Sequence, residues 1–308
     1  MSVVPIDLVS VIEKGVRDDQ RAPDGLLHAS GDLVGSLRHS QLGFVGAPTL
    51  PRHLVEDIRL RTGTMWHEYI GSLLTAAGVP YMAEVALAPW MPEGWSGTAD
   101  LIFWHPEYEA WVLVDIKTMK GEGLQWVEKD GMKEEHLWQA SSYWHALVAA
   151  GFPMLDKFGI LYLPMNMVYG ESMPNPSIQE GTPISWDTLG PVMEERHRAC
   201  REYADSLIVE DGAYLIEDNA YLAPEQERVQ KVFWAGSKKP QQWDVKLVPH
   251  WSAQFCPYPD ELCNCRNGKQ EKIGHWSVET GSLVWTPRKG YNIEPQVEPA
   301  PWEVKKRI

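Results

Sequence analysis

The sequence has few cysteines, no long apolar run and no excess of basic residues. Its longest apolar runs, such as Ala110 to Val114, are far too short to cross a bilayer. The N-terminal segment also lacks a basic stretch followed by a continuous apolar one, which a secretory signal requires. We therefore expect a cytoplasmic protein whose four cysteines are thiols or metal ligands rather than disulfides.

Basic residues are outnumbered, because 28 Lys and Arg stand against 42 Asp and Glu, for a net charge of -14. This balance argues against a protein that holds nucleic acid through a dense basic surface. It does not argue against an enzyme with metal-binding carboxylates, because a bound cation reverses the local field. The 15 tryptophans are expected mainly in the core, although a few could stack on the bases of a single strand.

Hydrophobic periodicity predicts an α/β fold with a mixed central β-sheet flanked by helices. We expect a core with N-terminal helices over residues 1–165, and a helical, cysteine-containing extension packed on it over 166–308. The order of elements is the basis for this prediction. The predicted elements are a helix over 31–42, a helix pair whose second member starts at Thr62 or Thr64, strands over 81–88, 97–104 and 111–117, a polar connection over 120–133, a helix over 134–150, a strand over 157–163, a helix over 190–207 and a strand-rich stretch over 214–222.

The strands over 97–104 and 111–117 are separated by a short loop, so we expect them to form an antiparallel hairpin. Its candidate site residues lie in two short segments, GTAD ending at Asp100 and DIK running from Asp115 to Lys117. Because side chains alternate along a strand, Asp115 and Lys117 project from one face, and Asp100 on the partner strand can reach the same point. Two converging carboxylates, to which the carbonyl of Ile116 can add a further oxygen, suit Mg²⁺ or Mn²⁺. Lys117 beside them is the candidate catalytic residue, which can orient or help deprotonate the attacking water and offset phosphate charge. The alternative is an exposed strand-end pair. Asp115 ends an apolar strand, where an unpaired carboxylate is costly, and this favours the functional interpretation.

Together with QASSY on the following helix, these segments resemble the PD-(D/E)XK nuclease superfamily. The similar branch is the RecB-like one, which includes phage exonucleases and CRISPR-associated adaptation nucleases. The resemblance covers His67 to Tyr143. It implies a restriction-endonuclease-like core and a Mg²⁺- or Mn²⁺-dependent DNA exonuclease of phage or bacterial recombination, repair or genome processing, acting in a bacterial cell or phage-infected host. Its implied partners are linear DNA ends or single strands and a recombination or annealing protein. The alternatives are an endonuclease of the same superfamily and a catalytically silent DNA-binding or scaffold subunit.

The resemblance also implies roles for individual residues. His67 would be a metal ligand, against the alternative of a histidine satisfied in the core. Glu84 would be a base or metal partner on the first strand, against an ordinary exposed glutamate. Gln139 and Tyr143 share a helical face, and the resemblance implies that they contact the substrate phosphate or position Lys117. Ordinary helix packing is their alternative.

The cysteines depart from one pattern within this branch, in which an iron–sulfur cluster uses one early and three late cysteines. Here no cysteine precedes Cys200. The late trio Cys256, Cys263 and Cys265 can form a structural zinc site with His250 as fourth ligand, and His275 and Cys200 are further candidates. Cys200 lies in a predicted helix, which favours burial in the core. Zinc, an iron–sulfur cluster and free thiols all remain open.

Overall fold

The computed structural model describes residues 24–47, 49–50, 54–165, 175–210, 213–215, 228–232, 242–248, 256–258, 271–277 and 282–285. The chain divides into two compact units, Met1–Glu225 with Ser252–Arg266, and Gln226–Trp251 with Asn267–Ile308. A division at residue 165 remains a prediction. None of the helices in the described ranges is both long and apolar enough to cross a membrane.

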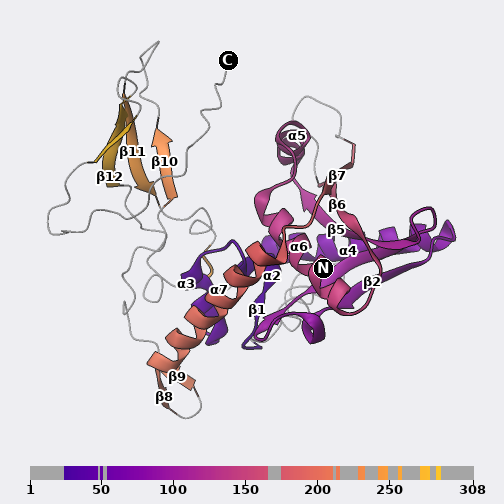
Figure 1. Ribbon diagram of the computed structural model, residues 1–308, viewed down its shortest axis with the longest axis horizontal. Helices are drawn as coiled ribbons and strands as arrows, with labels where there is room; N and C mark the ends of the chain where they lie inside the picture. Colours follow the sequence, from indigo (N-terminus) through magenta and orange to yellow (C-terminus); the bar gives the residue numbers. More distant parts are fainter. Residues whose placement is uncertain are drawn as a thin grey trace, which may run out of the picture. The chain divides into compact units, whose positions relative to one another are not determined.

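A five-stranded sheet forms the centre of the first unit (Figure 1). Its strands are β2 (Tyr81–Ala86), β4 (Thr98–His105), β5 (Ala110–Met119), β6 (Met154–Pro164) and β7 (Ser177–Gly181), in that spatial order. The β5·β6 pair is parallel and the other three pairs are antiparallel. A mixed sheet flanked by helices confirms the predicted fold class.

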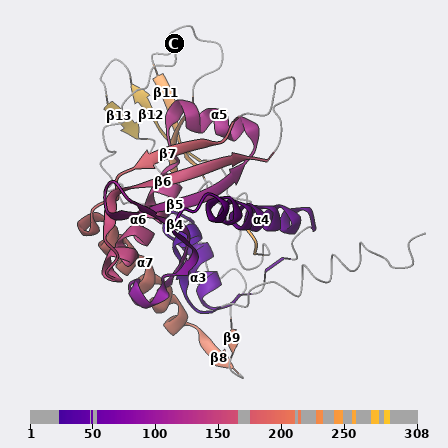
Figure 2. The same cartoon turned by 90° about the vertical axis from the view of Figure 1, so that its right-hand side faces the viewer.

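Four longer helices accompany this sheet: α4 (Leu54–Ala76), α5 (Gly121–Asp130), α6 (Glu134–Ala149) and α7 (Trp186–Ser206). Helices α5 and α6 both lie in the connection between the parallel strands β5 and β6. Helix α6 packs against both strands, α5 packs against β6, and α4 packs against β2 and β5. Figure 2 shows these helices around strands β4 to β7. The core joins apolar residues of the sheet to those of α5, α6 and α7.

Smaller elements complete the description. They are β1 (Leu27–His28), α2 (Ala29–Asp32), α3 (Leu37–Phe44), the 3₁₀ helix η1 (Ala88–Trp90), β3 (Trp95–Ser96), β8 (Ile208–Glu210) and β9 (Ala213–Leu215). The second unit contains a four-stranded antiparallel sheet of β10 (Arg228–Val232), β11 (Gln242–Val248), β12 (Glu271–Ser277) and β13 (Ser282–Trp285).

The hairpin of β4 and β5 forms as predicted, with a four-residue turn over 106–109. Strand β5 is buried on both faces from Leu113 to Ile116, as expected of a central strand. The helix predicted over 134–150 is α6, and the one predicted over 190–207 is α7, which begins four residues earlier, at Trp186. Part of the strand-rich stretch over 214–222 lies outside the described residues.

The predicted helix pair before the sheet is wrong, because α4 is continuous from Leu54 to Ala76. The hydroxyl of Thr62, one of the two residues expected to start the second helix, instead donates to the Ile58 carbonyl within α4 at 2.9 Å. This internal bond satisfies the hydroxyl without ending the preceding turn.

Two further boundaries differ from the prediction. The helix expected over 31–42 is divided into α2 and α3, because Ser36 accepts a hydrogen bond from the His39 N–H and starts α3 as an N-cap. The segment expected to be a polar connection contains α5, whose Leu124 and Val127 are buried one helical turn apart. Two apolar positions among glycines and charges are a weak periodic signal, so tertiary packing decides this helix.

Candidate active site

Three acidic residues lie in a row across adjoining strands. The strand registers place Glu84 of β2 beside Asp100 of β4, and Asp100 beside Asp115 of β5. Glu84 and Asp100 have no recorded backbone pair with each other, nor do Asp100 and Asp115, and Asp115 instead pairs with Ile160 of β6. Neighbours in register on antiparallel strands lie close together, so the sequence pattern and the pairing together bring three carboxylates to one part of the sheet.

Asp100 is positioned by the backbone of β5. The Ile116 N–H donates to Asp100 Oδ2 at 2.7 Å, so a side-chain oxygen takes the place of a ladder acceptor. Burial raises the pKa of Asp100 to about 6, with a further upward contribution from the charge of Asp115. The charges of Lys117 and His67 and the bond from Ile116 act in the opposite direction. The site therefore holds a carboxyl group whose ionisation is opposed until positive charge is supplied.

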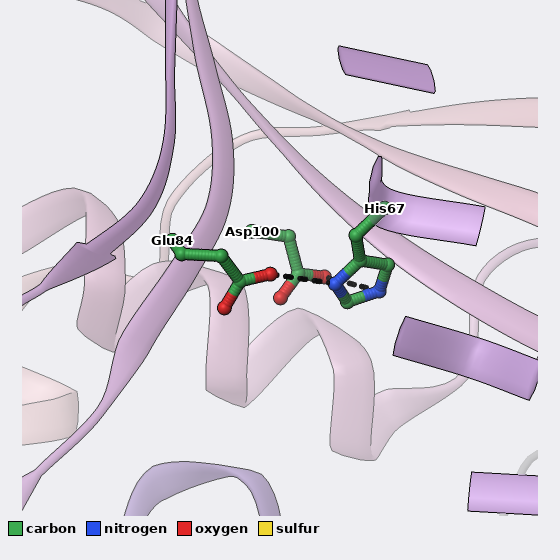
Figure 3. Close-up of side chains that lie close together, drawn as sticks. All are labelled: His67, Glu84 and Asp100. Carbon is green, nitrogen blue, oxygen red and sulfur yellow. Dashed lines mark hydrogen bonds and ion pairs between the residues drawn. The ribbon is translucent and has the colours of Figure 1, made fainter. Parts of the chain in front are cut away.

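His67 reaches the same group from α4. Its Nδ1 lies 2.8 Å from Glu84 Oε1 and its Nε2 lies 3.8 Å from Asp100 Oδ2 (Figure 3). One ligand atom from each of these three residues lies within 4.8 Å of the other two. His67 shares one face of α4 with Ile70 and Leu74, and all three are partly buried.

Glu84 joins this group through an unusual backbone conformation. Its φ is +51°, in the left-handed region that L-residues other than Asn and Asp seldom adopt. The residue is more than half exposed, so core packing does not impose the conformation. Strained backbone of this kind is concentrated at functional sites, and here it accompanies the Glu84 contact with His67.

Asp115 is completely buried and has two polar neighbours. Its Oδ1 accepts a hydrogen bond from Gln139 Nε2 at 3.1 Å, and its Oδ2 lies 2.8 Å from Lys117 Nζ. The approach of Lys117 is that of an ion pair, and Oδ2 has no partner with hydrogen-bond geometry. Burying a carboxylate is costly unless it is paired, so the ion pair and the Gln139 bond account for its presence inside the fold.

Gln139 and Tyr143 share one face of α6, as predicted. Gln139 Nε2 also donates to the Tyr143 hydroxyl at 3.1 Å, and both side chains are almost fully buried. Burial and the charge of Asp115 raise the pKa of Tyr143 well above its usual range. The structure thus brings this pair to Asp115, while contact with a substrate stays a proposal.

Gly97 of the GTAD segment has a packing role that the sequence did not lead us to predict. A Cβ on Gly97 would lie 2.4 Å from Cε1 of Tyr143. Glycine therefore lets the Tyr143 ring pack directly beside the strand that carries Asp100. A glycine three residues before a candidate acidic ligand was the signal available in the sequence.

His136 is a second feature that sequence reasoning missed. It lies on α6 three residues before Gln139, and its Nδ1 is 2.8 Å from the hydroxyl of Tyr162. The helical spacing of His136, Gln139 and Tyr143 could have indicated it, because residues three and four apart share a face.

The donor set fits a hard divalent cation. Carboxylate oxygens are the preferred ligands of Mg²⁺ and Mn²⁺, and imidazole is acceptable to Mn²⁺. Asp115 adds a buried oxygen without a hydrogen-bond partner beside this set. The N–H of Ile116 donates to Asp100, and the role of the Ile116 carbonyl as a further metal ligand remains a prediction.

The cysteine region is described only in part. Cys256 is buried in a small cluster with Leu42 and Tyr258, and Cys200 is buried in the main core, as predicted. Neither forms a disulfide. The remaining proposed ligands, His250, Cys263 and Cys265, lie outside the described residues, as does the side chain of His275. A metal site at these cysteines stays a prediction.

No family model and no curated protein matches the sequence. Among solved structures, the chain is similar to an alkaline exonuclease (LHK-Exo) from Laribacter hongkongensis, at 12% identity and a TM-score of 0.40, over 59% of this chain and 88% of that one. A structure of LHK-Exo in complex with dAMP gives 14% identity and a TM-score of 0.38, over 58% of this chain and 87% of that one. The likeness is distant.

Proposed function

We propose that the protein is a metal-dependent deoxyribonuclease that hydrolyses phosphodiester bonds. The observation that carries this proposal is the row of Glu84, Asp100 and Asp115 across three strands, with His67 at one end and Lys117 paired to Asp115. A buried carboxylate beside a second carboxyl of raised pKa is costly for the fold. A cation bound by this group would stabilise the ionised carboxylates and offset that cost.

In the proposed mechanism, His67, Glu84, Asp100 and Asp115 would hold Mg²⁺ or Mn²⁺. The bound cation would supply water activation and polarisation of the phosphodiester. Lys117, fixed by Asp115, orients the attacking water and offsets phosphate charge. Gln139 holds the second oxygen of Asp115 in place, so that the carboxylate keeps its direction when the substrate binds.

We further propose that the enzyme is an exonuclease, because the sequence resembles RecB-like nucleases. A role in recombination, repair or genome processing in phage or bacteria follows from the same resemblance. Linear DNA ends or single strands are the expected substrates. A recombination or annealing protein is the expected partner.

Turnover of end-labelled linear DNA tests the proposal. With Mn²⁺ or Mg²⁺ the wild-type protein should release labelled nucleotides, and EDTA should stop the reaction. Lys117→Met should lower kcat by roughly 10²- to 10⁴-fold, the usual contribution of a positioned group in proton transfer. The matched control is Lys157→Met, because Lys157 is an exposed lysine of β6 that pairs with Glu180 and should not affect turnover.

The alternatives give different results in the same assay. Cleavage of closed circular DNA would indicate an endonuclease, whereas resistance of circles alongside degradation of linear DNA indicates an exonuclease. Equal behaviour of the wild-type protein and Lys117→Met would exclude the enzyme and leave a silent scaffold. Metal analysis of the purified protein addresses the separate prediction of zinc or iron–sulfur at the cysteines.

A further inference from the structure

The site has a second layer of contacts beyond Asp115, formed by α6 and β6. The parallel register pairs Lys117 of β5 with Tyr162 of β6, so the two side chains lie on one face of the sheet. On α6, His136 precedes Gln139 by one turn, and its Nδ1 lies 2.8 Å from the Tyr162 hydroxyl. His136 therefore lies near Lys117 through its contact with Tyr162, one helical turn from Gln139, which contacts Asp115.

The hydrogen bonds of Tyr162 determine which nitrogen of His136 carries the proton. The Tyr162 hydroxyl is buried and accepts the backbone N–H of Lys133 at 3.3 Å. Among its described partners, the acceptor left for its own proton is His136 Nδ1. The hydroxyl therefore donates to Nδ1, and the neutral imidazole carries its hydrogen on Nε2.

Charge and burial keep this arrangement in one form. Burial, together with the charges of Lys117 and Lys133, lowers the pKa of His136 to about 3. Burial raises the pKa of Tyr162 to about 12. At working pH the pair is thus a neutral imidazole and a neutral phenol, and its hydrogen-bond direction does not change.

Nε2 is the ring nitrogen of His136 that the contact with Tyr162 leaves free. Among the described residues it has no hydrogen-bond partner, and it is not one of the buried nitrogen atoms that lack one. The ring is only partly buried, which agrees with an accessible edge. A neutral donor fixed in direction, next to the ammonium of Lys117, suits an anionic oxygen.

We propose that His136 is a substrate-binding residue whose Nε2–H donates a hydrogen bond to a phosphate oxygen of the DNA strand, beside Lys117. This proposal rests on the proposed nuclease function. Tyr162 is the positioning residue, because its hydroxyl fixes the tautomer of His136 and bonds to the start of α6. A purely structural role would need the contact with Tyr162 and would not need the free Nε2–H.

Two substitutions at His136 in the full-length protein separate these roles. His136→Phe keeps a ring of similar size without a donor, and His136→Gln keeps an amide donor near the Nε2 position. Because a hydrogen bond to a charged group is lost, we expect kcat/KM on end-labelled single-stranded DNA to fall roughly 10- to 100-fold in His136→Phe. His136→Gln should retain most of the activity. The matched control is His145→Gln on the same helix, whose ring bonds to the Ile184 carbonyl and should not affect cleavage.

Salt dependence gives a readout that a structural role would not produce. Affinity for a single-stranded oligonucleotide is measured with Ca²⁺ in place of Mg²⁺ at several salt concentrations. A lost neutral donor should weaken binding at every salt concentration without changing the slope of log K against log salt, whereas Lys117→Met should make that slope shallower. Wild-type affinity and kcat/KM in His136→Phe would overturn the proposal, and so would equal losses in His136→Phe and His136→Gln.

If neither variant folds, ¹⁵N NMR of the imidazole in the wild-type protein decides. A proton on Nε2, and a shift of that nitrogen when the oligonucleotide is added with Ca²⁺, are the expected results. A proton on Nδ1, or no shift on binding, would overturn the proposal. A wild-type protein that cleaves no DNA with Mn²⁺ would refute the nuclease function itself. Normal cleavage by wild type and His136→Phe, with inactive Lys117→Met, would refute the role of His136 alone.

Discussion

Replacing Asp100 by asparagine tests whether the candidate site holds charge that destabilises the metal-free fold. Burial raises the pKa of Asp100 from 3.8 to about 6, and the charge of Asp115 adds to the effect. The Ile116 N–H keeps an acceptor in the variant, because the asparagine oxygen can occupy the same place. The variant therefore removes the unfavourable charge and retains the backbone contact.

The sign follows from the direction of the shift. The pKa is higher in the folded protein than in the unfolded chain, so folding favours the protonated carboxyl of Asp100. Below about pH 4 the group is mostly protonated in both states, and the folded protein has the full benefit of this neutral form. The free energy of unfolding falls as the pH rises through about 6, and at higher pH the ionised carboxyl lowers it by a constant amount. A shift of about two units corresponds to roughly 3 kcal/mol at most, and the coupling to Asp115 and Lys117 reduces this to roughly 1–3 kcal/mol.

Unfolding of the two proteins in EDTA, between pH 4.5 and 8, measures the effect. At pH 8 Asp100→Asn should exceed the wild type in Tm by about 2–10 °C, and at pH 4.5 the gap should shrink to about a third, because the carboxyl of the unfolded chain is still mostly ionised there. Asp156→Asn, an exposed change on β6, is the control and should stay within about 0.5 kcal/mol of wild type.

Metal addition should close or reverse this difference in stability. Saturating Mn²⁺ at about 100 times its Kd should stabilise the wild type by roughly 2.7 kcal/mol and Asp100→Asn much less. A difference between the two proteins that does not change with pH would refute the linkage argument. A variant that is less stable than wild type at pH 8 without metal would refute the assignment of Asp100 as a destabilising charge.

Three further substitutions test the supporting contacts. Gln139→Leu leaves Asp115 Oδ1 buried without its donor, so urea unfolding should show a loss of roughly 1–3 kcal/mol, whereas an unchanged midpoint would contradict the contact. Glu84→Gly should be more stable than Glu84→Ala by roughly 1 kcal/mol in thermal unfolding, because φ is +51° there, and the reverse order would show that this conformation is not strained. Gly97→Ala should lose roughly 1–3 kcal/mol because its Cβ would lie 2.4 Å from Tyr143 Cε1, while Gly123→Ala, with neighbours at ordinary distances, should not; equal midpoints would refute the packing argument.

Much of the sheet was predictable because its signals are local. Strand β5 reads as a central strand from its apolar run, and a short connection of turn-forming residues makes the hairpin with β4. The helix α6 follows from a long amphipathic pattern ended by glycine and proline. Where the signal was short, as in α5 with two buried apolar residues, the prediction failed, since packing supplied the stability that local pattern did not.

The candidate site divides in the same way. Strand alternation alone places Asp115 and Lys117 on one face, and helical spacing alone places Gln139 with Tyr143. Their ion pair and hydrogen bonds form as those faces allow. These relations depend on residues at most four apart in sequence, where backbone geometry leaves little choice.

Strand periodicity and residue type were enough to select Asp100, Asp115 and Lys117 as site residues and to give the strand face from which Asp115 and Lys117 project. Tertiary structure alone decided that Glu84 lies with His67 and Asp100, and that His136 contacts Tyr162. The physical reason is that faces are fixed by local periodicity, whereas the meeting of faces depends on strand register and helix packing. Those are set by the whole core and leave no local trace in the sequence.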